Sequence, residues 1–428
     1  MEDEIQDDMD LLESGSSDSD DDYGPMVRTE GMELEEFDRN LPAAHSYLPK
    51  NLQPIPGRSV LEPGWTGRVL CWRHKSVVFP GETIPMVFVN TLDMDIMQHM
   101  IQGNRLFGLV FKEIQGLEGT HTYGVLCEVV EATPPVNTAG HHLFREPFSF
   151  KAKARQRFIL KAKGDVLIRR IDSVEIKILP DVSLNDPLEN VRFSSLGRHK
   201  NVPKTRMNEL VRKADSMTTP WPQFVYDVFD VDRVVEKIRE YFSKMDFANL
   251  PNDNLSLSYW VGTNLSVSNK DRLSLFCTNN IVLRLSMELY HIGQKSRVLC
   301  CVLCGTEVCE KSKVFAMSNE GIYSNFCNIG GYVHDIMTAS EVTNLTLQGT
   351  PSTKFTWFPG YSWTIAVCTT CGSHVGWRFD ACKVNLNPAS FWGLGRRSLV
   401  HDTENNVFED PMSENRNAAP TNATPTPE

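Results

Sequence analysis

The stretch Thr350–Phe379 reads TPSTKFTWFPGYSWTIAVCTTCGSHVGWRF; it contains three of the chain's eight tryptophans, a Cys-x-x-Cys pair and no acidic residue. Its Cys368–Gly372 element has the same Cys-x-x-Cys-Gly form as Cys301–Gly305. In each element two sulfurs three residues apart can hold one ion, and the glycine permits a tight turn. Four thiolates suit a closed tetrahedral zinc site with a structural role. We therefore expect one structural Zn²⁺, bound by Cys301, Cys304, Cys368 and Cys371.

Most of the eleven cysteines lie between Cys300 and Cys382, and this clustering favours a metal site over disulfides. Cys300 and Cys309 remain alternative ligands, although neither reproduces the Cys-x-x-Cys-Gly form. The 63 residues between the two elements are too many for a simple zinc ribbon. The zinc is therefore expected to clamp a small β-domain over residues 298–403.

The tryptophans of the same stretch point to a binding pocket. A Pro-Gly turn separates Trp357 from Trp363 and would fold the two indoles toward each other. Trp377 and Phe379 alternate along one strand, so they point to the same side. Ordinary core aromatics are one alternative, and a cage for methyl-lysine is another. Because residues 342–379 contain no carboxylate, the local charge favours a neutral, flat ligand with polar edges.

The net charge of −11 is concentrated at the N-terminus. Residues 1–38 hold sixteen acidic residues and one basic residue, so the rest of the chain is at +4. We predict a disordered acidic head over residues 1–40. No basic stripe for nucleic acid and no apolar run long enough for a membrane span stand out, and there is no basic signal region. These features predict a cytoplasmic and nuclear protein that contacts neither nucleic acid nor a membrane.

Residues 58–182 are patterned as a mixed, mostly β domain. Residues 94–101 favour a short helix, and alternation at Val174, Ile176 and Ile178 indicates a strand with one buried face. Residues 133–147 are expected to form a long loop. Further strands are predicted at residues 79–89, 106–112 and 124–130.

Residues 183–297 change to a helical period. Apolar residues over 231–245 share one face, and Asp230 is placed to cap that helix. A second helix is predicted to begin after Ser268, with Asp271 at the capping position, and to run through Leu289. The aromatic segment 220–229 is either bundle core or a docking surface for a large partner. Residues 404–428 are expected to be a disordered tail.

Two groups of motifs resemble known families. Phe79-Pro-Gly, Arg105-Leu-Phe-Gly-Leu-Val and Arg155-Gln-Arg-Phe are similar to the Lon N-terminal substrate-binding domain. The C-terminal part resembles the thalidomide-binding (CULT) domain of the cereblon family. The motifs that carry this second resemblance are Pro351-Ser-Thr-x-x-x-Trp-Phe-Pro-Gly-Tyr-x-Trp363, Cys368-x-x-Cys-x-Ser-His-x-Gly-Trp-x-Phe379, Gly331-Tyr-Val-His334 and Phe391-Trp-Gly-Leu394. The expected fold class is α+β: a Lon-like domain, a helical bundle and a zinc-bound all-β CULT domain.

The resemblance implies a non-catalytic substrate receptor of a cullin-RING ubiquitin ligase. Its helical part would dock on the triple-propeller adaptor of the cullin-4 ligase. Its pocket would bind small glutarimides and the cyclic imides left at protein C-termini by cyclised Asn or Gln, presenting those proteins for ubiquitination and degradation. The implied ligand-binding residues are Asn328, Phe355, Trp357, Trp363, Trp377 and Phe379. The family often has His where this chain has Phe355, so only the backbone of that residue could accept from an imide N–H.

Two other functions remain as alternatives. Residues 371–379 also resemble zinc-bearing methionine sulfoxide reductases, which need a reactive cysteine on a late strand. The comparable segment here, Phe391–Leu394, has no thiol, and Cys382 lies about ten residues too early. The other alternative is a Lon-like peptide-binding adaptor with no connection to a ligase.

Overall fold

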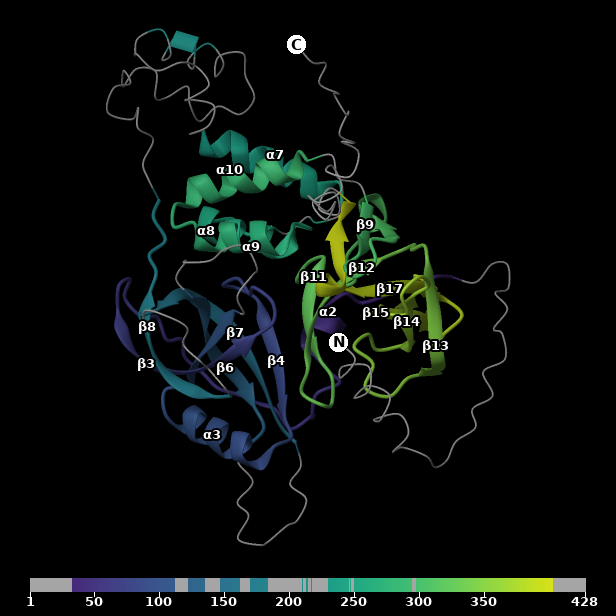
Figure 1. Ribbon diagram of the computed structural model, residues 1–428, viewed down its shortest axis with the longest axis horizontal. Helices are drawn as coiled ribbons and strands as arrows, with labels where there is room; N and C mark the ends of the chain where they lie inside the picture. The colour runs from purple at the N-terminus through teal and green to yellow at the C-terminus, as the bar shows by residue number, and fades with distance from the viewer. Residues whose placement is uncertain are drawn as a thin grey trace, which may run out of the picture.

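The computed structural model describes residues 33–111, 122–134, 147–161, 170–183, 210, 213–214, 217, 230–245, 247, 250–294 and 298–402. Within these residues a β-barrel and a β-sheet domain lie side by side, and a group of four helices covers one end of the barrel (Figure 1). The fold class is therefore α+β, as predicted.

The N-terminal barrel is a ring of five strands with two more attached. β6 (Tyr123–Ala132) pairs with β5 and with β7, and the pairings β5–β3, β3–β8 and β8–β7 close the ring. Only the β3–β5 pairing is parallel among these. The other strands are β2 (Gln53–Pro54), β3 (Thr66–His74), β4 (Thr83–Phe88), β5 (Leu106–Phe111), β7 (Phe148–Leu160) and β8 (Asp172–Ile178).

The periodicity of the sequence explains these elements. Ile176 and Ile178 of β8 are fully buried while Glu175 and Lys177 face water, as the alternation predicted. The predicted short helix is α3 (Thr91–Gln102), whose N-terminus is capped by the Asn90 side chain. Residues 135–146 of the predicted long loop lie outside the described part of the chain.

Four helices follow the barrel: α7 (Val231–Ser243), α8 (Asn254–Asn264), α9 (Asn269–Cys277) and α10 (Ile281–Ile292). The predicted caps are confirmed, because Asp230 accepts from Arg233 N and Ser268 accepts from Asp271 N. The prediction of one continuous helix from Ser268 to Leu289 is wrong. The chain is extended at Thr278 and Asn280, and Asn280 starts α10 by accepting from Leu283 N. Residues 220–229 lie outside the described residues.

These helices share a core with the barrel. Tyr259, Leu275 and Phe276 belong to the same buried cluster as barrel residues such as Phe79 and Phe150. Gly262 of α8 lets the Phe79 ring approach closely, because a Cβ there would lie 2.9 Å from that ring. The barrel and the helices are therefore packed as one body.

The C-terminal domain contains a six-stranded antiparallel sheet in the order β11-β12-β17-β15-β14-β13 and a three-stranded sheet in the order β10-β9-β18. The larger sheet consists of β11 (Tyr323–Cys327), β12 (Val333–Ala339), β13 (Leu345–Ser352), β14 (Tyr361–Cys368), β15 (His374–Ala381) and β17 (Ser390–Gly395). The smaller sheet consists of β9 (Val298–Cys301), β10 (Glu307–Glu310) and β18 (Leu399–His401).

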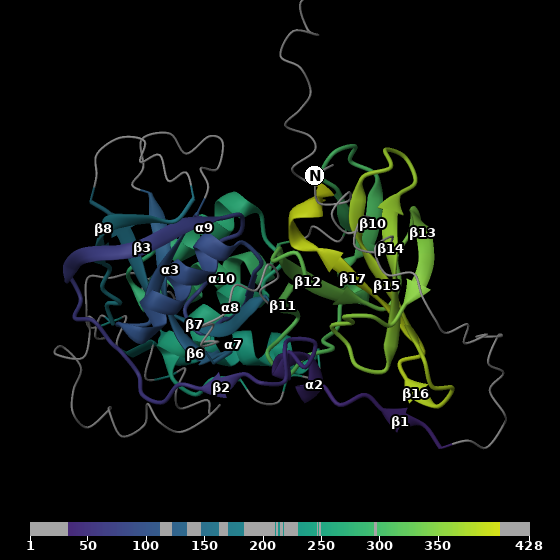
Figure 2. The same cartoon turned by 90° about the horizontal axis from the view of Figure 1, so that it is seen from below.

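The segment before the barrel is tied to the C-terminal domain. β1 (Glu35–Glu36) pairs in parallel with β16 (Leu386–Asn387), and α2 (Asn40–Ala44) follows it (Figure 2). Phe37 is buried against the Tyr361 ring at 5.4 Å. The acidic head was predicted to extend to residue 40, but residues 35–44 form these elements because Phe37 finds apolar partners far along the chain.

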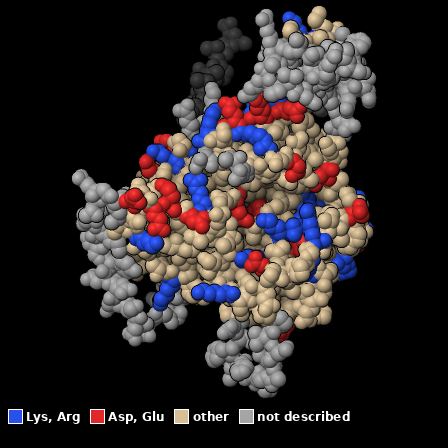
Figure 3. All heavy atoms as spheres, turned by 180° about the vertical axis from the view of Figure 1, so that it is seen from behind, with Lys and Arg blue, Asp and Glu red and all other residues tan. Residues whose placement is uncertain are grey.

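Charges of both signs are interspersed on the face opposite to that of Figure 1, with uncharged surface between them (Figure 3). None of the helices in the described ranges is both long enough and apolar enough to cross a bilayer.

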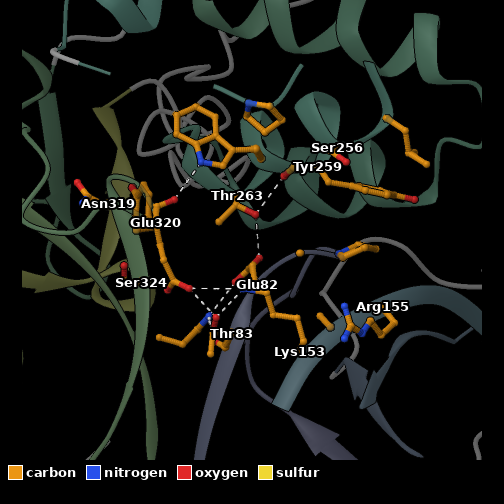
Figure 4. A pocket seen from close by; sticks show the side chains of 18 of the residues that line it. Glu82, Thr83, Lys153, Arg155, Ser256, Tyr259, Thr263, Asn319, Glu320 and Ser324 are labelled. Carbon is orange, nitrogen blue, oxygen red and sulfur yellow. Dashed lines mark hydrogen bonds and ion pairs between the residues drawn. The ribbon is translucent and has the colours of Figure 1, made fainter. Parts of the chain in front are cut away.

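The barrel, the helices and the C-terminal domain meet around Glu82 and Glu320 (Figure 4). Glu320, just before β11, accepts from Thr83 Oγ1 at 2.5 Å and lies 3.6 Å from Lys153 Nζ, while its backbone carbonyl accepts from Trp260 Nε1 of α8. A cavity of about 420 Å³ lies beside this junction and is lined by residues of all three parts. The junction fixes how the C-terminal domain sits on the barrel.

Candidate metal centre and aromatic binding site

The two Cys-x-x-Cys-Gly elements form matching turns that face each other. Gly305 and Gly372 have φ of 72° and 70°, a left-handed conformation that glycine adopts readily. Each glycine N–H donates to the carbonyl of the first cysteine of its own element, over 2.9 and 2.8 Å. A hydrogen bond of 2.9 Å between Thr306 and Thr370 joins the two turns. Backbone hydrogen bonds thus fix each pair of cysteines within its turn, and the threonine hydroxyls fix the two turns to each other.

The four sulfur atoms are spaced as a tetrahedral zinc site requires. All four lie within 4.8 Å of one another: Cys301 Sγ is 3.7 Å from Cys371 Sγ, and Cys304 Sγ is 3.6 Å from Cys368 Sγ. Zn–S bonds of about 2.3 Å in a tetrahedron place the sulfurs about 3.8 Å apart. The predicted set Cys301, Cys304, Cys368 and Cys371 thus fits a zinc ion.

The thiols differ in how readily they ionise. Hydrogen bonding from the Thr306 hydroxyl lowers the pKa of Cys304 to about 6, whereas burial raises the pKa of Cys301 to about 11. A bound divalent cation favours the thiolate of each ligand and so counteracts the effect of burial on Cys301. The Ser373 hydroxyl lies 3.0 Å from Cys371 Sγ and 3.4 Å from Cys301 Sγ, where it can donate to either thiolate.

The two alternative ligands lie outside this cluster. Cys300 is adjacent to Cys301 on β9, so the two side chains point to opposite faces of the sheet. Cys309 is buried and its Sγ contacts the carbonyl oxygens of Glu310 and Glu341. Burial raises the pKa of Cys309 to about 12.

The sheet next to the cysteines places the aromatic residues on one face. Trp363 of β14 is paired with Phe379 of β15, and Ile365 is paired with Trp377. Residues two apart on a strand and residues directly opposite each other share a face. Strand β14 contains both Trp363 and, five residues later, the metal ligand Cys368. The strand thus connects the aromatic face to the metal centre.

Trp357, Trp363 and Trp377 are called here the tryptophan cluster. The Trp357 and Trp377 rings meet edge to face with centroids 4.8 Å apart, and they are 8% and 5% exposed. Trp363 is half-buried at the edge of the same aromatic core. Trp357 Nε1 donates to the Cys327 carbonyl at 3.3 Å, and Trp363 Nε1 donates to the Lys354 carbonyl at 2.8 Å. Both indole nitrogens are thus fixed by backbone oxygens.

The remaining predicted ligand residues lie at different depths. Phe379 is buried, and its ring is stacked on the Phe391 ring with centroids 5.0 Å apart. Asn328 is half-buried in the turn after β11, where its Oδ1 accepts from Tyr332 N. Phe355 is 56% exposed, in the loop between β13 and β14. Burial of the two indoles is a property that core aromatics share with a binding site.

Sequence reasoning assigned no role to His334, although it quoted the motif that contains this residue. The His334 ring lies 5.1 Å from the Trp377 ring and 5.5 Å from the Trp357 ring. Its Nε2 is buried and has no hydrogen-bond partner among the described residues. Burial lowers the pKa of His334 to about 3, so a neutral imidazole lies beside the tryptophan cluster. The pairing of β12 with β11 and with β17 brings it there, and no local pattern marks it.

Two family models match the chain. A family model described as "ATP-dependent protease La (LON) substrate-binding domain" matches residues 69–294. Another, described as "Yippee zinc-binding/DNA-binding /Mis18, centromere assembly", matches residues 297–402. A solved Lon N-terminal domain protein from Xanthomonas campestris is 14% identical to this chain, with a TM-score of 0.30. The match covers 52% of this chain and 98% of that one, and this likeness is too remote to support an argument.

The first model covers more than half of the chain, so the chain belongs to the family of the Lon protease substrate-binding domain. Its curated relatives include proteins named cereblon, which confirms the resemblance predicted from the motifs. This chain is 32% identical over 376 residues to cereblon of Drosophila virilis, and the alignment covers 85% of this chain and 57% of that protein. For Drosophila melanogaster cereblon the identity is 31% over 375 residues, covering 85% of this chain and 62% of the relative. The chain thus spans less than two thirds of the length of these relatives.

Proposed function

We propose that this protein is the substrate-recognition subunit of a cullin-RING ubiquitin ligase, and that the tryptophan cluster binds cyclic imides. The proposed ligands are glutarimides and protein C-termini that end in a cyclised Asn or Gln. The observation that supports this most strongly is the edge-to-face pair Trp357–Trp377 beside the half-buried Trp363, on a sheet joined to a four-cysteine cluster. One zinc ion in that cluster would be structural.

The chemistry of the ligand follows from the groups around the cluster. A flat, uncharged ring fits between indoles, where a charged group would lose its hydration without gaining an opposite charge. The imide N–H and carbonyl groups need hydrogen-bond partners once they are buried, because each polar group left unpaired would weaken binding by about 1–3 kcal/mol. The backbone near Phe355 and Trp363 can supply these partners, with Asn328 at the rim and Phe379 at the base.

We propose further that the helices dock on the triple-propeller adaptor of a cullin-4 ligase. The similarity to cereblons over 85% of the chain supports this assignment. A free-standing Lon-like adaptor remains the main alternative, and co-purification from cytoplasmic and nuclear extracts separates the two. The receptor should bring down the propeller adaptor, whereas a free-standing adaptor should not.

The properties of the thiols near the C-terminal end of the sheet fit a non-catalytic role better than the activity of a reductase. Cys382 lies just after β15, and burial raises its pKa, which disfavours the nucleophilic thiolate. Strand β17, the late strand that would need to carry the nucleophile, reads Ser-Phe-Trp-Gly-Leu-Gly.

Calorimetric titration of the full chain with a glutarimide tests the proposed site. The native protein should bind, and Trp363→Ala should weaken binding at least about tenfold, which is about 1.4 kcal/mol. Trp65→Ala is the matched control, since Trp65 is also half-buried but belongs to the barrel, and it should bind like the native protein. Absence of binding by the native protein, or full binding by Trp363→Ala, would refute the site.

A further inference from the structure

Phe355 combines two features that are uncommon for its residue type. Its φ is 55°, in the left-handed region that bulky side chains rarely adopt, and the residue is 56% exposed. Backbone strain of this kind persists where the surrounding structure enforces it, and it is frequent at ligand-binding positions. An exposed phenylalanine also leaves apolar surface in water, which burial against a partner would relieve.

The loop that holds Phe355 is fixed on both sides. Before it, Lys354 N donates to Ser352 Oγ, and the Lys354 carbonyl accepts from Trp363 Nε1. After it, Thr356 Oγ1 is hydrogen-bonded to the Phe358 carbonyl. The strained conformation is thus imposed by the contacts that position the tryptophan cluster.

Phe355 is linked along the chain to two members of the cluster. It is adjacent to Lys354, whose carbonyl holds the Trp363 indole, and it precedes Trp357 by two residues. Because consecutive Cα atoms are about 3.8 Å apart, its Cα is within about 8 Å of the Trp357 Cα. Trp357 is nearly buried whereas Phe355 is exposed, so the path from one to the other leads out of the protein.

We propose that the Phe355 side chain reads the residue that precedes the terminal imide, and that it favours a large apolar residue there. This inference rests on the proposed function, since it takes a chain whose C-terminal imide occupies the tryptophan cluster. The preceding residue of such a chain must then lie next to the tryptophan cluster on the side that faces water, where Phe355 exposes its ring. Contact between two apolar side chains removes both from water.

The test uses two peptides of equal length that end in the same cyclised glutamine and differ only in the preceding residue, Phe or Gly. Both are titrated against the full-length native protein, with a bare glutarimide as reference. Phe355→Asn removes the ring but keeps the left-handed backbone accessible, because Asn tolerates that region. Phe355→Tyr keeps an aromatic ring at the same position. Circular dichroism verifies that each variant is folded.

The native protein should bind the Phe peptide about fivefold more tightly than the Gly peptide, a modest ratio because the contact is half-open to water. Phe355→Tyr should keep this preference. Phe355→Asn should bind both peptides alike; the ratio of the two affinities is the readout, because a change in the backbone contact to the imide would alter both affinities equally.

The other outcomes separate the two proposals. Equal binding of both peptides by the native protein overturns this inference and leaves the imide site standing. The same holds if Phe355→Asn keeps the preference. If the native protein binds neither the peptides nor the bare glutarimide, the proposed function fails and the inference fails with it.

Discussion

Asn325 of β11 donates a hydrogen bond from Nδ2 to Glu82 Oε2 of the barrel over 2.8 Å. The other oxygen of Glu82 accepts from Phe79 N, from Thr263 Oγ1 of α8 and from Arg272 Nη2 of α9. Burial raises the pKa of Glu82, and the Arg272 guanidinium partly opposes this rise. One carboxylate thus joins the barrel, the helices and the C-terminal domain, and Asn325 makes that link from the C-terminal side.

Asn325→Ala should destabilise the protein by about 1–3 kcal/mol, because Glu82 Oε2 would be buried without its donor. Asn319→Ala is the matched control, since Asn319 is exposed and donates to Asn40 Oδ1 on the surface. It should change stability by less than about 0.5 kcal/mol. Chemical unfolding followed by tryptophan fluorescence measures both variants. Equal effects of the two substitutions would show that the junction does not depend on this hydrogen bond.

The metal centre makes a prediction about stoichiometry. Native mass spectrometry should find one zinc ion per chain, and Cys304→Ser should lose it, because a closed site needs all four thiolates. Cys300→Ser and Cys309→Ser are the controls, because these thiols lie outside the cluster, and they should keep one zinc. Loss of zinc from either control, with retention by Cys304→Ser, would reassign the ligands.

Removal of zinc should also unfold the C-terminal domain selectively. A chelator should change the fluorescence of the tryptophan cluster, since β14 connects Cys368 to Trp363. The barrel should keep its hydrogen-exchange protection under the same conditions, because its core contains none of the metal ligands. A chelator that leaves both parts protected would contradict a structural role for the metal.

A second buried network joins the barrel to the helices. Asp181 follows β8 and accepts from Arg157 Nη2 at 2.8 Å, from Arg284 Nη2 at 2.9 Å and from Tyr259 Oη at 2.6 Å. Both arginine side chains are fully buried. Asp181→Ala should therefore cost about 3 kcal/mol, since it leaves two buried cations without their shared anion.

Tyr259→Phe provides the graded comparison for Asp181→Ala. It removes the hydroxyl that donates to Asp181 and accepts from Arg157 Nε at 2.9 Å, and it leaves both ion pairs. At about 1 kcal/mol for each hydrogen bond, a loss of about 2 kcal/mol is expected. The ratio of the two effects, measured in urea, distinguishes loss of the anion from general disturbance of the packing. If Tyr259→Phe were as damaging as Asp181→Ala, the ion pairs would not be the main stabilising contacts.

The sequence was most informative where a local pattern determines the structure. The Cys-x-x-Cys-Gly spacing predicted four ligands that the fold brings together, because each pair is closed by its own turn. Alternation in β8 and the caps at Asp230 and Ser268 were also readable, since their partners lie within four residues.

Long-range partners left no such pattern. Nothing near Phe37 or Tyr47 indicates that they contact Tyr361 and Cys327, about 280 or more residues away. The junction at Glu82 and the position of His334 likewise depend on pairings of distant strands. The break between α9 and α10 was missed for a different reason: apolar residues on both sides of it continue the helical period, and this period outweighed the local signal of the Asn280 cap.

The N-terminal segment predicts a specific pH dependence. His45 is 2% exposed, and burial together with Lys151 and Lys153 lowers its pKa from 6.5 to about 3. The unfolded chain therefore binds a proton below pH 6.5 that the folded protein excludes. The stability that depends on neutral His45 is present above pH 6.5 and is lost as the pH falls toward 3.

Between pH 7 and pH 5 this loss should reach about 2 kcal/mol. His45→Asn should show a pH dependence smaller by that amount, because it has no proton to gain. The variant fits the site, since His45 has a left-handed φ of 50° at the C-terminal end of α2, a position that Asn favours. His99→Asn, which removes an exposed imidazole, should behave like the native protein. Chemical unfolding at pH 7 and at pH 5 gives the free energy of unfolding of each protein. If this free energy changed equally with pH in the native protein and in His45→Asn, His45 would be protonated in the folded state.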